Sequence, residues 1–459
     1  MSLRSRLYTF WMKKRPKSIS ATKVVALAFV AIILIGAGLL ALPAASRSGV
    51  SCGFRPALFI ATSATCVTGL SLFDTWTQWS GFGQAVILCL IEIGGLGFMS
   101  AATLLVFALR RRIGLKQRLV MAQALSVSDM DGIVKLQKTV LVGSFTVEAV
   151  GALILLLRFW PEYGFFTALK WGIFHSVSAF CNAGFDIFGC ITPGASLLEF
   201  QSDPIVLLTL GSLVVIGGLG FLVWQEIAEK RLFRKFSVYT KLVLLTTAAL
   251  ILVGTVLIAL VEWNNPGTLG SLSTGDKLLN ALFQSVTLRT AGFAAIDQAA
   301  LTEGGKGISM ILMIIGGSSG STAGGLKTVT FIVLALFIAA RARGKNTVCV
   351  FKRTIPERQV LDAMTIACIM LALVLFGGVF ISATSPIGLT DALYEAVSAI
   401  ATVGLTAGAT GALSIQAQYL IILYMYFARV GVLTISLGFL MGNRAEERFH
   451  YAETNLLIG

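Results

Sequence analysis

The sequence predicts an all-α integral membrane protein made of four pseudo-fourfold helix–pore-helix–helix units, with eight transmembrane helices and four re-entrant pore loops around one central pore. Two observations lead to this fold class. The chain is more apolar than soluble proteins are, with 56% hydrophobic residues, 13% charged residues and a mean hydropathy of +0.85. In addition, one short pattern recurs four times at a spacing near 110 residues.

Eight apolar stretches are long enough to form bilayer-spanning helices, each of which needs roughly 20 residues. Shorter half-apolar stretches of about 10–14 residues lie between the members of each pair, and they fit re-entrant segments because they cannot cross a bilayer. We therefore expect four pore units over residues 1–112, 113–230, 231–345 and 346–459, the third with a broken inner helix. The eight expected spans are residues 22–44, 81–109, 136–158, 204–226, 241–262, 308–340, 360–383 and 417–442.

The distribution of positive charge predicts the orientation of these spans. The net charge of +14 alone would suit nucleic-acid binding, but 27 of the 36 Lys and Arg residues lie in the two termini and three alternate loops. The four outward connections, residues 45–80, 159–203, 263–306 and 384–416, carry only six. This asymmetry follows the positive-inside rule. It predicts cytoplasmic termini and no nucleic-acid partner, with attraction to anionic membrane lipid as a by-product.

Each quarter contains an aromatic residue followed by a glycine ten positions later, or nine in the third quarter. A Ser-Ala pair lies between them in three quarters, whereas the third has Ser285-Val286-Thr287. Four matching patterns argue against coincidence among 47 glycines. We interpret each as a short pore helix and a glycine turn, with the third pore helix one residue shorter. The aromatic residues are Phe59, Phe174, Phe283 and Tyr394, and the glycines are Gly69, Gly184, Gly292 and Gly404.

The glycine turns have the composition of an ion-binding backbone. Oxygen ligands replace the hydration shell of an alkali ion, and glycine reaches the conformations that turn successive carbonyls to one side. The C-terminal ends of the pore helices carry partial negative charge, which favours a cation at the same place. Besides the four glycines, the expected ion-binding residues are Cys66, Val67, Thr68, Cys181, Asn182, Ala183, Arg289, Thr290, Ala291, Ala401, Thr402 and Val403.

A second repeat supports the same period. The run Ile-Gly-Gly-Leu-Gly-Phe occurs at residues 93–98 and again at 216–221, and the third quarter keeps Ile315-Gly316-Gly317. Small residues in such runs allow helices to pack closely, and we expect that role here.

The sixth span is interrupted by ten residues that include five glycines, which do not form a stable helix interior. A phosphate-binding loop is excluded because Leu326 separates the last glycine from Lys327. Two interpretations remain, a simple kink and a mobile gate on the cytoplasmic side of the glycine turns. The expected gate comprises Gly316, Gly317, Ser318, Ser319, Gly320, Ser321, Thr322, Ala323, Gly324, Gly325, Lys327 and Arg429.

Arg429 lies inside the last span, where a charge is costly and usually faces a cavity or a partner. One interpretation is a structural ion pair with Glu92 or Glu148, which also lie inside spans. The other is a positive barrier in the cavity beneath the glycine turns. For Arg289, beside the third turn, we expect a structural role in bracing the backbone of that turn.

These motifs resemble the Trk/Ktr/HKT superfamily of potassium transporters, and within it the membrane subunits of bacterial Ktr systems. The most specific motifs are Thr287 to Phe293 and Gly316 to Thr328. The resemblance implies that the four glycines form a potassium selectivity filter and that the glycine-rich loop and Arg429 form the gate. It also implies a homodimer with one pore per protomer in the bacterial cytoplasmic membrane, controlled by a cytosolic ring of nucleotide-binding regulatory subunits. Potassium, with sodium as a second candidate, is then the transported ion, and nucleotide is expected only on the regulatory partner.

Three function classes were weighed. Four re-entrant units and one broken helix favour a gated pore over a coupled secondary transporter, which usually has interrupted helices in corresponding positions of two halves. An enzyme has little support because the sequence shows no nucleophile–base pair and no carboxylate pair. The seven cysteines lack metal spacing, and His175 and His450 are the only histidines, so no resident metal centre is expected.

Overall fold

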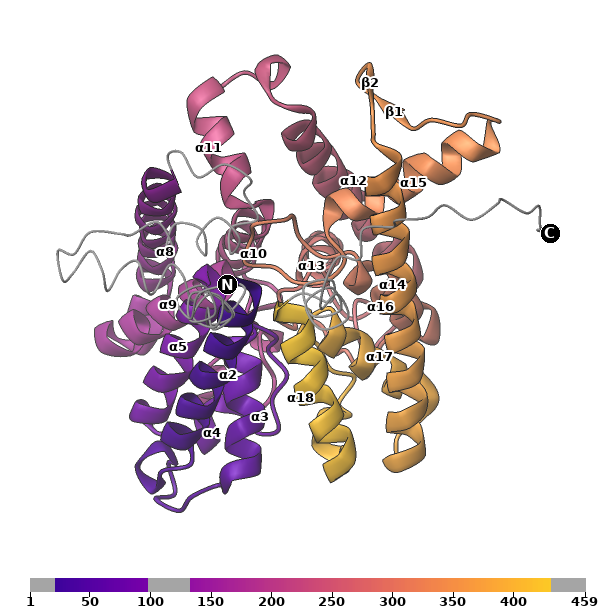
Figure 1. The fold of residues 1–459 in the computed structure, drawn as a ribbon. Coiled ribbons are helices and arrows are strands. Elements are labelled where there is room, and N and C mark those ends of the chain that lie inside the picture. Colours follow the sequence, from indigo (N-terminus) through magenta and orange to yellow (C-terminus); the bar gives the residue numbers. More distant parts are fainter. Residues whose placement is uncertain (1–20, 98–132, 431–459) are drawn as a thin grey trace, which may run out of the picture.

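The computed structural model describes residues 21–97 and 133–430, and it is almost entirely helical (Figure 1). Parts of the second and eighth expected spans lie outside these residues. The described α-helices are α2 (Ala21–Leu40), α3 (Phe54–Thr65), α4 (Thr75–Gln78), α5 (Gly81–Leu96), α8 (Ile133–Tyr163), α9 (Phe165–Phe180), α10 (Pro204–Leu219), α11 (Phe221–Lys230), α12 (Val238–Glu262), α13 (Thr274–Thr287), α14 (Glu303–Ile314), α15 (Thr328–Ala342), α16 (Glu357–Thr384), α17 (Leu389–Ile400) and α18 (Ile415–Val430).

Short 3-10 helices and one hairpin complete the described elements. The hairpin was not expected from the sequence. It has a two-residue loop, Phe351 and Lys352, and both residues have positive φ angles, which matches the twist of two paired strands. The 3-10 helices are η1 (Pro43–Ala45), η2 (Phe188–Cys190), η3 (Leu198–Phe200), η4 (Phe233–Lys235) and η5 (Thr410–Ala412), and the strands are β1 (Cys349–Val350) and β2 (Arg353–Thr354).

One arrangement recurs along the chain. A short helix packs against the long helix before it in the pairs α2–α3, α8–α9, α12–α13 and α16–α17. A further apolar helix then follows each pair, namely α5, α10, α14 and α18. The short helices have 12–16 residues, which at about 1.5 Å per residue is less than a bilayer thickness.

Several described helices carry apolar side chains on their outer surface. Three of them, α8, α12 and α16, are long and apolar enough to cross a bilayer, and α10 with α11 would make a fourth if the bent pair counts as one span. Leu252 and Leu260 on α12 are 65% and 73% exposed, and Val379 on α16 is 61% exposed. Such exposure is costly in water and ordinary in lipid.

The fourth expected span is not a straight helix. The axes of α10 and α11 meet at 93°, and the bend lies at Gly220, whose φ angle of 94° is open to glycine at little cost. The sequence had assigned residues 204–226 to one continuous span. The last glycine of the second Ile-Gly-Gly-Leu-Gly-Phe run therefore breaks a helix, and Gly97, the last glycine of the first run, caps the C-terminal end of α5.

Two of the expected inward loops lie at the same end of the molecule. Figure 1 shows α11 and the β1–β2 hairpin at the top and α4 at the opposite end. The two loops touch, since Lys241 Nζ lies 5.8 Å from the centroid of the Phe351 ring. This proximity agrees with the side that the positive-inside rule assigned to residues 230–241 and 341–358.

Candidate functional site: a ring of glycine strands above a broken helix

The four repeated glycines lie around one axis. A methyl group built on Gly69 would approach the carbonyl oxygen of Ala183, the residue before the next repeated glycine. The same relation holds from each quarter to the next and closes on itself: Gly184 faces Ala291, Gly292 faces Val403, and Gly404 faces Thr68. Every one of these approaches is shorter than 3.0 Å. The carbonyls before the four glycines therefore converge, and there is no room for a side chain at any glycine position.

The backbone of the four strands follows one conformation. Each repeated glycine has a positive φ angle, and so does the residue two positions before it. Left-handed conformations at Val67, Asn182, Thr290 and Thr402 cost energy in ordinary residues and persist only where the surroundings impose them. A repeated strained backbone that exposes carbonyls has the chemistry of an alkali-ion site.

A hydroxyl residue at the end of each pore helix fixes each strand. Ser63 Oγ accepts from the N–H of Gly69, and Ser398 Oγ accepts from Gly404. Ser178 Oγ donates to the Phe185 carbonyl, and Thr287 Oγ1 donates to Phe293 in the same way. Thr287 therefore occupies the place of the serine in the other quarters.

This equivalence corrects one expectation. Phe283 and Thr287 have the same separation as Phe59 and Ser63, so the third pore helix is not shorter. The missing residue lies between this hydroxyl residue and the glycine: the Ala291 N–H donates to Thr287 O, four positions back, whereas the Thr68 N–H donates to Ser63 O, five positions back. Residue types alone did not reveal this equivalence, because threonine replaces the serine that occupies the same position in the other three quarters.

The pore helices point their C-terminal ends at the ring. α3, α9 and α17 each end four residues before the repeated glycine, and α13 ends five residues before it. The inner helices press on these ends, because a methyl group on Gly94 or Gly217 would collide with the carbonyl of Thr65 or Phe180. The expected packing role of these two glycines is thus correct. The C-terminal ends of the four pore helices place partial negative charge close to the ring.

A cavity of about 340 Å³ opens above the ring, and all four repeated glycines line it. Its other lining residues include Asp74, Asp186 and Asp297 but no Lys or Arg. Burial, and to a smaller extent the neighbouring Asp74, raise the pKa of Asp186 to about 7. The sequence analysis missed these aspartates, although each lies two to five residues after a repeated glycine. This spacing was the available signal, and the cavity is suited to attract cations.

Below the ring, the broken helix forms a loop between α14 and α15. The loop closes on itself at its base, where Gly316 N donates to Leu326 O at 3.0 Å and Leu326 N to Ile314 O at 2.9 Å. Ser318 N and Thr322 N donate to the carbonyls of Gly218 and Gly217 on α10, at 3.0 and 3.3 Å. The backbone groups that the break frees are thus satisfied inside the protein, as non-helical backbone within a membrane requires.

The tip of the loop contacts two of the four strands. Thr322 Oγ1 donates to Phe180 O at 3.1 Å, at the end of the second pore helix, and lies 3.1 Å from the Asn182 side-chain amide. A methyl group on Gly324 would collide with Thr402 Oγ1 of the fourth strand. The loop therefore packs directly against the inner side of the ring.

Basic side chains bind the loop backbone. Arg429 Nη1 donates to Thr322 O at 2.6 Å, and its Nη2 donates to the carbonyls of Gly94 and Gly95 on α5. Lys327 Nζ donates to Ala323 O at 2.8 Å. Among the described residues Arg429 forms no ion pair with Glu92 or Glu148, so the first interpretation of this arginine is wrong.

Arg289 also differs from expectation. Its Nη2 donates to Gly316 O at 3.1 Å and to Thr328 Oγ1 at 3.3 Å, at the two ends of the loop. It braces the base of the broken helix rather than the backbone of the third turn. His175 has a structural place: Ile187 N donates to its Nε2, and its ring stacks on Phe188 at 3.8 Å.

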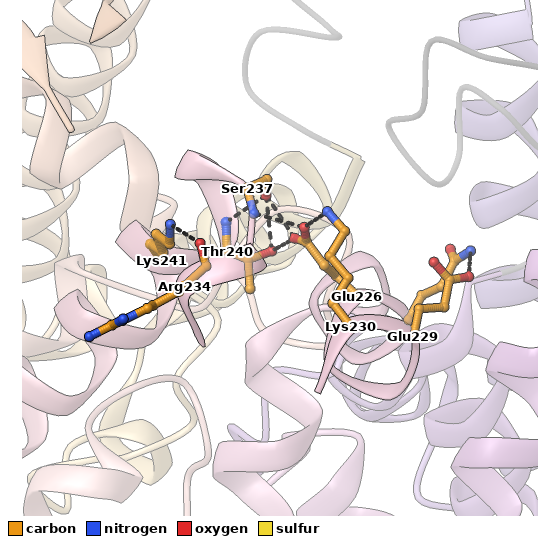
Figure 2. A network of polar contacts seen from close by, with 8 residues as sticks. Glu226, Glu229, Lys230, Arg234, Ser237, Thr240 and Lys241 are labelled. Carbon is orange, nitrogen blue, oxygen red and sulfur yellow. Dashed lines mark hydrogen bonds and ion pairs between the residues drawn. The ribbon is translucent and has the colours of Figure 1, made fainter. Parts of the chain in front are cut away.

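The loop is tied to the end of the molecule that carries the basic loops. Phe221 N, at the bend between α10 and α11, donates to Gly320 O at 2.9 Å, and Tyr239 Oη on α12 donates to Ser319 O at 3.1 Å. Figure 2 shows how α11 and α12 are held together: Glu226 accepts from Lys230, from Thr240 and from the N–H and hydroxyl of Ser237. Movement of this pair of helices would pull on the loop.

Comparison with known proteins identifies relatives over nearly the whole chain. The TrkH family model, described as "Cation transport protein", matches residues 5–449. The chain is 39% identical to the potassium/sodium uptake protein NtpJ of Enterococcus hirae, over 98% of this chain and 99% of the relative. It is 38% identical to the Ktr system potassium uptake protein B of Bacillus subtilis, over 98% of each chain. The crystal structure of the potassium transporter TrkH from Vibrio parahaemolyticus matches with a TM-score of 0.73 at 18% identity, over 94% of this chain and 86% of that one, which supports the fold.

Proposed function

Because this chain belongs to the TrkH family of cation transport proteins, we propose that it takes up potassium across the cytoplasmic membrane through a channel-like pore. The single observation that carries the proposal is the closed ring of four glycines with four converging carbonyls. The names of the relatives, which are potassium uptake proteins, support potassium as the ion. The family is one of transporters rather than enzymes.

The filter of this pore consists of the four glycine strands. Carbonyl oxygens around the axis replace part of the hydration shell of the ion, and the ends of the pore helices stabilise its charge. The aspartates of the outer cavity raise the local cation concentration before entry. Eight spans with cytoplasmic termini give this arrangement its orientation, and each of four units contributes one strand.

The loop between α14 and α15 is the gate. Its tip lies against the second and fourth strands, and Arg429 holds it from the opposite side. A loop in this position blocks the exit from the filter, and the arginine adds an electrostatic barrier to a cation. Opening requires the contacts of Thr322 and Arg429 to break, whereas the base of the loop can stay closed.

A coupled secondary transporter is the second candidate, and one observation favours it. The bend between α10 and α11 adds a second interrupted helix to the one in the third quarter, and such transporters use interrupted helices, although in corresponding positions of their two halves, whereas these two lie in adjacent quarters. The two candidates differ in their energy source. Flux through a pore follows the potassium gradient alone, whereas coupled transport needs a sodium or proton gradient.

The deciding experiment measures rubidium uptake by proteoliposomes that contain the purified chain, with equal sodium and pH on both sides. We expect uptake driven by the potassium gradient alone, and Gly292→Ser should lower both uptake and selectivity over sodium. Gly307→Ser is the matched control, because nothing lies near a methyl group at that glycine. Uptake that requires a sodium or proton gradient would favour the coupled transporter, and unchanged selectivity in Gly292→Ser would remove the filter assignment.

Regulation by a cytosolic ring of nucleotide-binding subunits and a homodimeric state complete the proposal. The exposed basic residues Arg231, Arg234 and Lys235 lie beside η4, at the end of the molecule that holds the gate contacts of α11 and α12. Growth rescue of a potassium-uptake-deficient bacterium, with and without a regulatory ring subunit from a related Ktr system, tests the partner. The mass of the purified chain in detergent tests the dimer.

A further inference from the structure

A pair of buried carboxylates lies behind the second filter strand. Glu92 on α5, Glu148 on α8 and Cys181 after α9 offer ligand atoms that all lie within 4.8 Å of one another. Glu148 is only 4% exposed and lies near the middle of α8, a helix long enough to cross a bilayer. The Cys181 thiol donates to Glu92 Oε2 at 3.5 Å, which leaves one oxygen of each glutamate, Oε1, without a hydrogen-bond partner among the described residues.

Among the described residues, no ion pair compensates the charge of these two carboxylates. Within residues 21–97 and 133–430, no Lys or Arg forms an ion pair with Glu92 or Glu148. The guanidinium of Arg429 is used on the carbonyls of Gly94, Gly95 and Thr322. α10, which packs on α8, carries no charged residue.

The surroundings of Glu92 and Glu148 strongly disfavour a negative charge on both carboxylates at once. The C-terminal end of the α9 pore helix adds partial negative charge beside the pair. An adjacent cavity of about 350 Å³ is lined mainly by apolar groups such as Leu88, Phe145 and Ile173. Two carboxylates this close together in an apolar site do not ionise together, because each like charge raises the free-energy cost of the other and burial raises both costs.

We propose that Glu92 and Glu148 form a proton-binding site, in which one exchangeable proton is shared between the two carboxylates and its occupancy regulates the pore. One carboxylate takes the proton from a hydronium ion and releases water, and the resulting O–H donates to the other carboxylate. The pair then carries one negative charge instead of two. The Cys181 thiol, which donates to Glu92, stays protonated in this arrangement.

The proton is the ligand that best fits the site. A metal ion held by the same three groups would need further oxygen ligands or water, and the apolar lining of the cavity offers few. A shared proton needs only one oxygen from each carboxylate, and the two carboxylates offer oxygens within 4.8 Å of each other. In the described part of the chain, the other titratable or charged groups around the pair are Cys89, which lines the same cavity, Cys181 and Arg429.

A chain of direct contacts through α5 connects the carboxylate pair to both the filter and the gate. A methyl group on Gly95 would collide with Cys181, and one on Gly94 would collide with the Thr65 carbonyl, so this segment of α5 touches two filter strands. The same two glycines accept from Arg429, which bonds the gate loop at Thr322. Loss of the shared proton would drive Glu92 away from Glu148 and shift this segment.

Infrared spectroscopy of the purified protein in lipid tests the site directly. A protonated carboxylic acid has a carbonyl stretch that an ionised carboxylate lacks. The difference spectrum between the wild type and the double variant Glu92→Gln/Glu148→Gln should contain such a band, and this band should bleach as the pH is raised; the subtraction removes the bands of other protonated carboxyls such as Asp186. The difference spectrum between the wild type and the control Glu199→Gln, an exposed residue, should lack it. Absence of the band from the double-variant difference spectrum overturns the proposal, as does a stoichiometric metal that the wild type carries and the double variant loses.

Rubidium flux through proteoliposomes tests the regulatory half, which rests on the proposed function. Wild-type flux should change over the pH range in which the band bleaches, and the permanently neutral double variant should lose this change. Identical pH profiles overturn the regulatory role. Absence of potassium-gradient-driven flux in the wild type would count against the proposed function while the infrared result still decides the site, so the two failures are distinguishable.

Discussion

The contact between the loop tip and the second filter strand gives the sharpest prediction. Thr322→Val keeps the shape of the side chain but removes the hydroxyl that donates to Phe180 O at 3.1 Å and lies 3.1 Å from the Asn182 amide. A hydrogen bond contributes about 0.5–1.5 kcal/mol net, so two such bonds contribute about 1–3 kcal/mol to the closed state. At 1.4 kcal/mol per factor of ten, the closed-to-open equilibrium should shift roughly 5- to 150-fold toward the open state.

The assay is rubidium uptake by proteoliposomes without any regulatory partner, where a closed gate limits the flux. Thr322→Val should raise the initial rate, up to the point at which the open filter itself becomes limiting. Thr255→Val is the matched control, because the Thr255 hydroxyl donates to Ile251 O at 2.7 Å within its own helix α12. A rate for Thr322→Val equal to or below that of wild type, with the control unchanged, would refute the idea that the loop closes the pore.

Three further predictions concern the loop, the outer cavity and an interhelical ion pair. Deletion of residues 317–324 should raise rubidium flux, since the flanking glycines already lie side by side and can be joined without distorting α14 and α15; unchanged flux would make the loop a simple linker. The pKa of Asp186 near 7 means that this carboxyl is charged at pH 8 and neutral at pH 6. Uptake at limiting potassium should therefore fall over that range, by at most roughly fivefold for about 1 kcal/mol, and Asp186→Asn should remove the dependence while Asp362→Asn keeps it. Lys306, which is 7% exposed, donates to Asp391 at 2.7 Å and joins α14 to α17. Lys306→Met should lower the free energy of unfolding in detergent by about 1–3 kcal/mol. An unshifted unfolding midpoint would show that this ion pair contributes little.

The period of the glycines was enough to predict the ring. Four backbone segments with equal spacing and a shared polar marker imply equivalent positions, and the structure brings Gly69, Gly184, Gly292 and Gly404 together. The pattern misled at one position only. Thr287 supplies the hydroxyl that serine supplies in the other quarters, so an alignment by residue type placed the missing residue before this hydroxyl instead of between it and the glycine.

The breaks in the inner helices were harder to predict. A glycine in an apolar run serves either to pack two helices closely or to end one, and composition does not distinguish these roles. Gly217 packs against the Phe180 carbonyl, whereas Gly220, three residues later, turns the chain by 93°. The interruption in the third quarter was predictable because five glycines within ten residues leave no helical alternative.

The partners of the buried charges depended on tertiary structure alone. The sequence offered Arg429 two carboxylates within the spans, and opposite charges suggest an ion pair. The arginine instead donates to three backbone carbonyls. They are free to accept a hydrogen bond from a side chain because α5 ends at Gly97 and the sixth span is broken. Backbone acceptors of this kind leave no mark in the residue types, which is why the lack of an ion pair at Glu92 and Glu148 within the described residues became visible only in the folded chain.

The closed ring of four strands has a consequence for mutagenesis. In a channel assembled from four identical subunits, one codon change alters all four positions around the axis at once. Here a single polypeptide supplies every strand, so Thr68, Ala183, Ala291 and Val403 can each be replaced separately. Under the proposed function, ion preference can therefore be adjusted one quarter at a time, and single, double and triple replacements form a graded series within one gene.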